Sequence, residues 1–325
     1  MYIQLEFPLL SIGEKIMPNN RVFYACQAVK LGGSTLGGVQ SVGVNSTFNF
    51  EQVFQLGQLE IYENIEGIPE VEVTIEKAIT GAGDSLWKSL GGTVTLVGDK
   101  QEKVEFSVYN DSGANAFPAD AGSQILSVEC TGMYLSNYSF AMQIDGPATE
   151  SVTMTGNDKK WGAGNAGTIS KNTAGNVVKR VGLNSGTLPK GTSKIQSINV
   201  SVDMAREDLS QLGSKYPYFR APQYPVEVTS EFVYNADGSI ESDGAEMFGA
   251  GGTDTEKCKD VTQNTTLSFV VGTCNKTSGA KVNYLTFNLG TANRLTGVQF
   301  GGGDAGGGNA TVTYSYVNYN SLTVT

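Results

Sequence analysis

Two stretches of this chain repeat each other at a separation of 156 residues. Residues 39–57 align without a gap to residues 195–213, with identical residues at seven of the 19 positions. The same separation places Pro69 on Pro225, and the tetrapeptide Val-Glu-Val-Thr follows each proline closely. Because these matches fall in the same order in both stretches, we interpret the chain as a tandem duplication, which requires a fold that can be built twice.

The duplication defines the expected domain layout. We expect copy 1 over residues 1–157 and copy 2 over residues 195–325. Between them, residues 158–194 are rich in Gly, Asn and Lys, which predicts a linker or long loop whose early part is open to assignment to the second copy.

Period-two alternation predicts strands in both copies. Around residues 70–76, Val71, Val73 and Ile75 alternate with carboxylates, so one face of this strand is expected in a core. Residues 84–92 form the best helix candidate, with Asp84 in front and glycine at the end. The fold class that we expect is mainly β: two β-sandwich or β-barrel domains, each with a short helix.

The composition excludes several kinds of chemistry. The chain has no histidine, which removes Ser–His–Asp and Cys–His catalysis and histidine metal sites. Its four cysteines show no metal-ligand spacing, so we expect free buried thiols, with a Cys258–Cys274 disulfide as the alternative. We therefore expect no enzyme activity, no cofactor and no metal site.

Charge and hydropathy bear on partners and location. The net charge of −10 makes the chain a poor candidate for gripping phosphates, since nucleic-acid affinity comes largely from clustered Lys and Arg. The first residues lack the basic region of a signal peptide, and no apolar stretch approaches the roughly 20 residues that span a bilayer. We expect a protein that folds in the cytosol and has no membrane partner.

A proline-rich aromatic segment follows the second repeat at residues 216–225. Its three prolines exclude a central strand, so it is expected to be an extended arm or loop. Aromatic residues together with arginine are typical of protein–protein contacts, although a loop packed on its own domain is the alternative. The candidates for a subunit interface are Tyr216, Tyr218, Phe219, Arg220 and Tyr224.

These motifs resemble those of a known family. Residues 205–213, then Pro-Tyr-Phe-Arg at 217–220, then Pro-Val-Glu-Val-Thr at 225–229 are similar to the pattern of bacteriophage tail tube proteins. Copy 1 keeps Gly57 and Pro69 of this pattern, as copy 2 keeps Gly213 and Pro225, but it has Glu-Ile-Tyr-Glu in place of Pro-Tyr-Phe-Arg.

The resemblance implies a structural role. Tail tube subunits carry a long hairpin and form stacked six-domain rings with a continuous inner β-barrel, so a duplicated chain implies three chains per ring. At four strands per domain the barrel has about 24 strands and a backbone diameter of about 50 Å, which leaves room for a DNA duplex. The implied partners are the chain itself, other tail proteins with or without a sheath, and the tape-measure protein and DNA in the lumen. The implied location is the tail of the virion, after assembly in the host cytoplasm.

Carboxylates are the expected lining of such a lumen, because they repel phosphate within a Debye length of about 8 Å. The candidates are Glu70, Glu72, Glu76, Glu227 and Glu231, and alternation alone leaves open whether the face that carries them meets the lumen or the outside.

Two other functions stay open at this point. A tail-tip, baseplate or other virion component would use the same domains in a single ring. A carbohydrate-binding adhesin or hydrolase would use exposed tryptophans, of which the chain has only Trp87 and Trp161 to offer.

Overall fold

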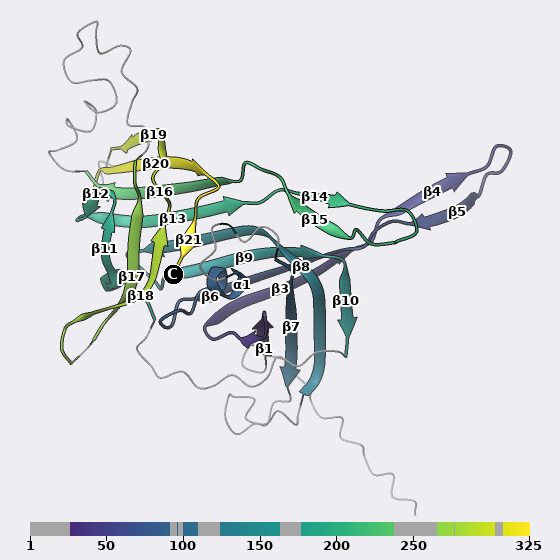
Figure 1. Ribbon diagram of the computed structural model, residues 1–325, viewed down its shortest axis with the longest axis horizontal. Coiled ribbons are helices and arrows are strands. Elements are labelled where there is room, and N and C mark those ends of the chain that lie inside the picture. Colours follow the sequence, from purple (N-terminus) through teal and green to yellow (C-terminus); the bar gives the residue numbers. More distant parts are fainter. Residues whose placement is uncertain are drawn as a thin grey trace, which may run out of the picture.

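The computed structural model describes residues 27–91, 96, 100–109, 124–162, 177–236, 265–275, 277–302 and 308–325. Within these ranges the chain is mainly β, as the sequence predicts, and its strands pair antiparallel throughout. Figure 1 shows strands in several layers, with two hairpins that project from one side of the body. None of the described helices is long and apolar enough to cross a membrane.

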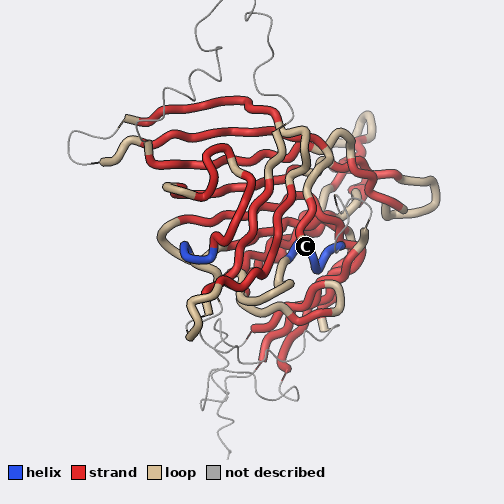
Figure 2. Tube along the Cα trace, turned by 60° about the vertical axis from the view of Figure 1, so that its left-hand side comes forward, coloured by secondary structure: helices blue, strands red, loops and turns tan. Residues whose placement is uncertain are grey.

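One long sheet runs through both halves of the chain. Eight of its strands pair in the order β3-β6-β9-β8-β13-β16-β20-β19, and Figure 2 shows such strands stacked side by side. Their bounds are β3 (Val39–Thr47), β6 (Glu70–Ala78), β8 (Gln124–Gln143), β9 (Thr149–Gly156), β13 (Ile195–Asp203), β16 (Glu227–Asn235), β19 (Arg294–Gly301) and β20 (Thr311–Tyr319).

A second layer covers each half. In the first half, the beginning of β8 continues past the long sheet and pairs with β7, which pairs with β1; β2 and β10 lie at the edges. In the second half, a four-stranded sheet has the order β11-β17-β18-β21. The bounds are β1 (Gln27–Leu31), β2 (Ser34–Thr35), β7 (Glu102–Tyr109), β10 (Asp158–Trp161), β11 (Leu183–Thr187), β12 (Pro189–Thr192), β17 (Ser268–Cys274), β18 (Lys281–Asn288) and β21 (Thr323–Val324).

The two halves share their pairing order. In the long sheet, β3-β6-β9-β8 is matched by β13-β16-β20-β19, and in the second layer β1-β7-β8 is matched by β11-β17-β18. The single strand β8 of the first half therefore corresponds to two strands, β18 and β19, in the second.

The registers match in detail as well. A bulge lies between Val39 and Ser41 in the β3–β6 ladder, and another between Ile195 and Ser197 in the β13–β16 ladder. Glu70 pairs with Thr47, and Glu227 pairs with Asp203. By register Val71 thus corresponds to Val228, two residues beyond the Val226 that the repeated tetrapeptide suggests. A shift of two leaves every side chain on the same face, so the sequence alignment keeps the correct face despite the offset.

Helix α1 (Leu86–Gly91) packs against the first half of the sheet, within the range expected to be helical. Its Trp87 is fully buried and meets Tyr138 edge-to-face, with ring centroids 4.9 Å apart. In the second half, Phe269 and Phe287 stack at 4.7 Å, and both contact Phe140 of β8. A segment matching α1 in the second half would fall in residues 237–264, outside the described residues.

The core of the first half also holds ionic side chains. Lys77 and Glu150 are cross-strand neighbours in the β6–β9 ladder, and both are fully buried. Lys77 forms an ion pair with Asp84. Glu150 accepts hydrogen bonds from Ser85 Oγ (2.6 Å), Tyr138 Oη (2.7 Å) and the Leu86 backbone N–H (2.8 Å), so it satisfies polar groups at the start of α1.

The range 158–194, expected to be a linker or loop, contains strands. Its first residues form β10, which pairs with β8, and its last residues form β11 and β12 ahead of β13. The Gly- and Asn-rich composition hides these strands, because β11 buries few apolar side chains of its own. Residues 163–176 lie outside the described residues.

Cys130 is buried and free, and Cys274 is half-buried and free, with its thiol 3.8 Å from the Val181 carbonyl. Burial raises the pKa of the Cys130 thiol to about 11. Because Cys274 is free, the alternative Cys258–Cys274 disulfide has no support. Cys26 and Cys258 lie outside the described residues.

Candidate functional site

One face of the long sheet is buried in the core and the other is polar. On β6 and β16 most apolar residues point inward, and the alternate residues, Val233 among them, point out. All five candidate carboxylates lie on the outward face: Glu70, Glu72 and Glu227 are exposed, and Glu76 and Glu231 are half-exposed. The neighbouring outward positions carry mainly small polar side chains: Ser41, Asn45, Thr74, Ser139, Ser151, Thr153, Asn199, Ser201, Thr229, Thr313 and Ser315.

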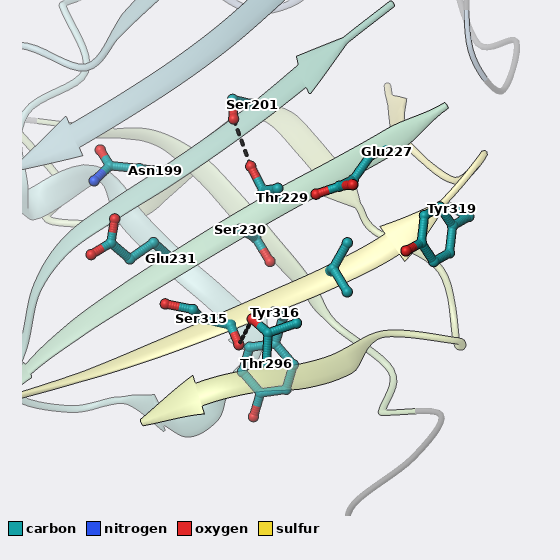
Figure 3. Close-up of a pocket in the computed structure, with 11 residues that line it drawn as sticks. Asn199, Ser201, Glu227, Thr229, Ser230, Glu231, Thr296, Ser315, Tyr316 and Tyr319 are labelled. Carbon is teal, nitrogen blue, oxygen red and sulfur yellow. Dashed lines mark hydrogen bonds between the residues drawn. The ribbon is translucent and has the colours of Figure 1, made fainter. Parts of the chain in front are cut away.

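An open hollow of about 460 Å³ lies on this polar face in the second half, and Figure 3 shows the residues that line it. Ser201 and Thr229 hydrogen-bond across it at 2.6 Å, and Glu227, Glu231 and Tyr319 are among the residues that line it. On the first half, Ser41 Oγ donates to Glu76 Oε2 at 3.2 Å. The face is therefore hydrophilic and acidic, and it is an extended surface rather than an enclosed cavity.

The two halves meet within the sheet where β8 pairs with β13. Seven residue pairs form this internal junction, from Ser197 with Gln143 to Asp203 with Asn137. Beyond it, the Met204 N–H donates to the Ser136 carbonyl at 2.8 Å. Its inward side chains, Phe140, Tyr138, Ile198, Val200 and Val202, are all fully buried.

The described strands leave the sheet with two free edges, β3 at one end and β19 at the other. β19 matches β8: each has a bulge against its partner strand, between Leu135 and Asn137 in β8 and between Leu295 and Gly297 in β19. At each bulge a hydroxyl group donates to the carbonyl of the partner strand, Ser136 to Thr153 at 3.1 Å and Thr296 to Ser315 at 3.0 Å. β3 matches β13 through the ungapped alignment. The free edges are therefore the counterparts of the two strands that pair at the internal junction.

Burial differs sharply between these counterparts. Phe140 at the internal junction is 1% exposed, whereas its counterpart Phe300 on β19 is 57% exposed. Met204 beside β13 is 1% exposed, and its counterpart Phe48 beside β3 is 64% exposed. Each free edge thus exposes large apolar side chains at the positions that the internal junction buries.

The first projecting hairpin pairs β4 (Phe50–Phe54) with β5 (Ile61–Glu66). Apolar side chains are exposed along its whole length, at Phe50, Phe54, Leu56, Leu59, Ile61, Tyr62 and Ile65. An isolated two-stranded hairpin is marginally stable at best in water, and exposed apolar surface of this extent is common at interaction sites.

The second hairpin pairs β14 (Arg206–Leu209) with β15 (Phe219–Pro222) and is tied to the body. Arg206 Nε donates to the Leu135 carbonyl at 2.7 Å, and its guanidinium carbon lies 4.9 Å from the Tyr134 ring centroid. Lys215 near its tip forms an ion pair with Glu66 of the first hairpin at 2.8 Å. This contact and its hydrogen bond lower the pKa of Glu66 and raise that of Lys215.

The five interface candidates of the second hairpin divide into two groups. Tyr216, Tyr218 and Tyr224 are exposed. Phe219 is half-buried against Tyr134, and Arg220 is buried, with its Nε 3.3 Å from Asp208 Oδ1 and its Nη1 4.0 Å from Glu70 Oε1. Phe219 and Arg220 therefore hold the hairpin to its own chain.

The repeat-equivalent glycines both adopt positive φ in the turns of these hairpins, 89° at Gly57 and 88° at Gly213. Pro69 and Pro225 precede β6 and β16, the strands that carry the acidic face. Trp87 is buried within α1, and Trp161 is exposed on β10.

Sequence reasoning missed the free edges as a site. The signal was present, because the aligned pairs Phe48/Met204 and Val44/Val200 are apolar in both stretches. Which residue of each aligned pair is buried depends on which strand lies beside it in the sheet, and the repeat alone does not give the order of the strands.

The sequence matches no protein-family model, and a search of curated proteins gives no match either.

Proposed function

We propose that this chain is the structural subunit of a hollow tube made of stacked rings, of the kind that forms a phage tail tube. The observation that carries the proposal is that the two strands at the free edges correspond to the two strands that pair at the internal junction. The sheet begins with the counterpart of β13 and ends with the counterpart of β8, and those two strands pair inside the chain. Repeating the internal junction between chains joins β19 of one copy to β3 of the next and leaves no free edge within a ring.

The number of strands supports a closed ring of suitable size. In this proposal the two halves are copies of one unit, and eight strands per chain in three chains give a barrel of about 24 strands and about 50 Å in backbone diameter. A head-to-tail contact closes into a ring when its rotation divides a full turn, and the internal junction supplies the rotation between copies.

The polar face supports a lumen that lets nucleic acid pass. In the closed ring this face is the inner one, and Glu70, Glu72, Glu76, Glu227 and Glu231 come from every copy. Carboxylates repel phosphates within a Debye length of about 8 Å, so DNA slides through without adhering.

The projecting hairpins support stacking. Both point to the same side of the body, and their exposed apolar and tyrosine side chains fit an adjacent ring better than solvent (Figure 1). In this proposal the first hairpin supplies most of the apolar contact, and Tyr216, Tyr218 and Tyr224 add to it.

Electron microscopy of the purified chain tests the function. We expect rings about 50 Å across at the barrel wall, with threefold symmetry, and hollow filaments at higher concentration. Single rings that never stack favour a tail-tip or baseplate component. Compact monomers at all salt and protein concentrations overturn the proposal.

A further inference from the structure

In the proposed ring, β19 of one chain pairs with β3 of the next, and we call this contact the joint. Its residue pairs can be specified from the internal junction, an inference that rests on the proposed function. β8 and β19 correspond at a separation of 160 residues, because the bulge at Leu135 matches the bulge at Leu295. β13 and β3 correspond at 156 residues through the ungapped alignment. The pairs of the internal junction can then be transferred without any free choice of register.

The transferred register places chemically suitable residues opposite each other. The pair Phe140–Val200 becomes Phe300–Val44, which buries the exposed Phe300. The pair Ser139–Ser201 becomes Gln299–Asn45 on the polar face, and Ala141–Asn199 becomes Gly301–Gly43. Both Gly43 and Gly301 belong to extended strands, so their pairing brings two backbones together without side-chain obstruction.

At the end of the joint nearest the hairpins, a cation and an aromatic ring lie opposite each other, as they do at the internal junction, but on exchanged strands. At the internal junction, Tyr134 of β8 lies under the guanidinium of Arg206, at the base of the second hairpin. The counterpart of Tyr134 is Arg294, and the counterpart of Arg206 is Phe50 at the base of the first hairpin. The strand that supplies the ring inside the chain supplies the cation at the free edge.

Both members of this second pair are available. Phe50 and Arg294 are exposed, and no described residue forms a hydrogen bond or ion pair with the Arg294 guanidinium. Arg294 lies on the outward face of β19, opposite Val317. Arginine over an aromatic face is a favourable contact, and it is stronger when water is excluded.

We propose that Arg294 of one copy stacks on Phe50 of the next copy and fixes the head-to-tail joint in the register Asn45–Gln299. The partner is a second copy of this chain. The pair also gives the joint its direction, since β3–β3 or β19–β19 pairing would bring together like residues and leave Arg294 without a ring.

Disulfide trapping tests the register in the full-length chain. In the variant Asn45→Cys/Gln299→Cys the two Cα atoms are directly opposite, within the range that a disulfide spans. The matched control is Gly43→Cys/Gln299→Cys, on the same face but two residues out of register, at roughly 7–8 Å. The Gly43 site has open space for the added side chain. The single variants report reactions with the native cysteines and any β3–β3 pairing.

We expect mild oxidation to link the first pair into covalent species of two and three chains, with little product from the control. Cross-linking of the control pair, or of Asn45→Cys alone, overturns the register even if rings are seen by microscopy. Cross-linked species of more than three chains, together with open filaments instead of rings, would support the pairing of β19 with β3 and contradict the closed ring of three chains.

An exchange experiment tests the Arg294–Phe50 contact. Phe50→Arg places two cations together, and we expect the concentration for half-assembly to rise by about tenfold or more. Adding Arg294→Tyr rebuilds the arrangement of the internal junction, and we expect assembly to return to within about threefold of the original. A double variant that assembles no better than Phe50→Arg overturns the contact, and the fold of each variant is checked by circular dichroism.

Discussion

The two halves of the molecule place different chemistry at the same two positions of the same ladder. Lys77 pairs with Glu150 in the β6–β9 ladder, and the matching positions of the β16–β20 ladder hold Tyr234 and Val312. All four side chains are buried. The backbone pairing is therefore compatible with two ionisable side chains in one half and with a tyrosine and a valine in the other.

The layer above the ladder explains the difference. In the first half a helix begins directly over Glu150, and its first N–H and the Ser85 hydroxyl need an acceptor that water does not supply. In the described part of the second half, the Tyr234 hydroxyl donates to the Gly191 carbonyl at 3.1 Å, and its ring meets that of Tyr314 edge-to-face. The buried carboxylate of the first half thus serves the start of α1, and the same backbone pairing forms without a carboxylate in the second half.

Glu150→Ala is the change with the largest expected effect on this comparison. It leaves the Tyr138 and Ser85 hydroxyls and the Leu86 N–H without their buried acceptor, and we expect a loss of about 3–5 kcal/mol in the free energy of unfolding. Chemical denaturation measures the loss. Glu150→Gln keeps an acceptor in place and is the matched control, with a smaller loss. Equal losses in the two variants would mean that the size of the side chain matters and its hydrogen bonds do not.

Val312→Ala tests the apolar counterpart and is expected to cost about 2 kcal/mol, from lost burial and the remaining cavity. The same denaturation experiment applies. A loss as large as that of Glu150→Ala would mean that apolar packing at this position contributes as much as the hydrogen bonds of Glu150.

The smallest expected effect is a dependence on pH. Burial raises the pKa of Glu150, although its hydrogen bonds and Lys77 oppose the shift. The folded chain therefore holds this proton more tightly than the unfolded chain does. The stability that follows is fully present below the ordinary value of 4.5 and is lost as pH rises through the raised pKa.

Denaturation at a series of pH values from 5 to 8 measures this dependence. We expect stability to fall with rising pH in the original chain, and Glu150→Gln to remove that part of the slope. A slope that is unchanged in Glu150→Gln would assign the titration to another group.

Much of the fold could be predicted from local pattern. Alternation gave the inward and outward faces of β6 and β16, and residues 84–92 contained α1. The same alternation places Lys77 on the face of Val71, Val73 and Ile75, so its burial was readable, although nothing local identified Asp84 as its partner.

The candidate site was only half predictable. The five carboxylates do share one exposed face, because period two fixes faces within a strand. The β8–β13 junction was not predictable, since it depends on the order of strands from distant parts of the chain. Local pattern also did not separate the interface candidates by exposure: Phe219 contacts Tyr134 and Arg220 is buried, whereas the three tyrosines are exposed.

The continuous strand β8 has a mechanical consequence. Its backbone belongs to both layers of the first half, so those layers cannot slide past each other without breaking ladder hydrogen bonds. In the second half the layers are joined through the connector between β18 and β19, where Asn293 Nδ2 bonds to the Gly290 and Thr265 carbonyls and Asn318 bonds to Asn293. We therefore expect the two layers of the first half to resist relative motion more strongly than those of the second half, where separate strands and this connector join them.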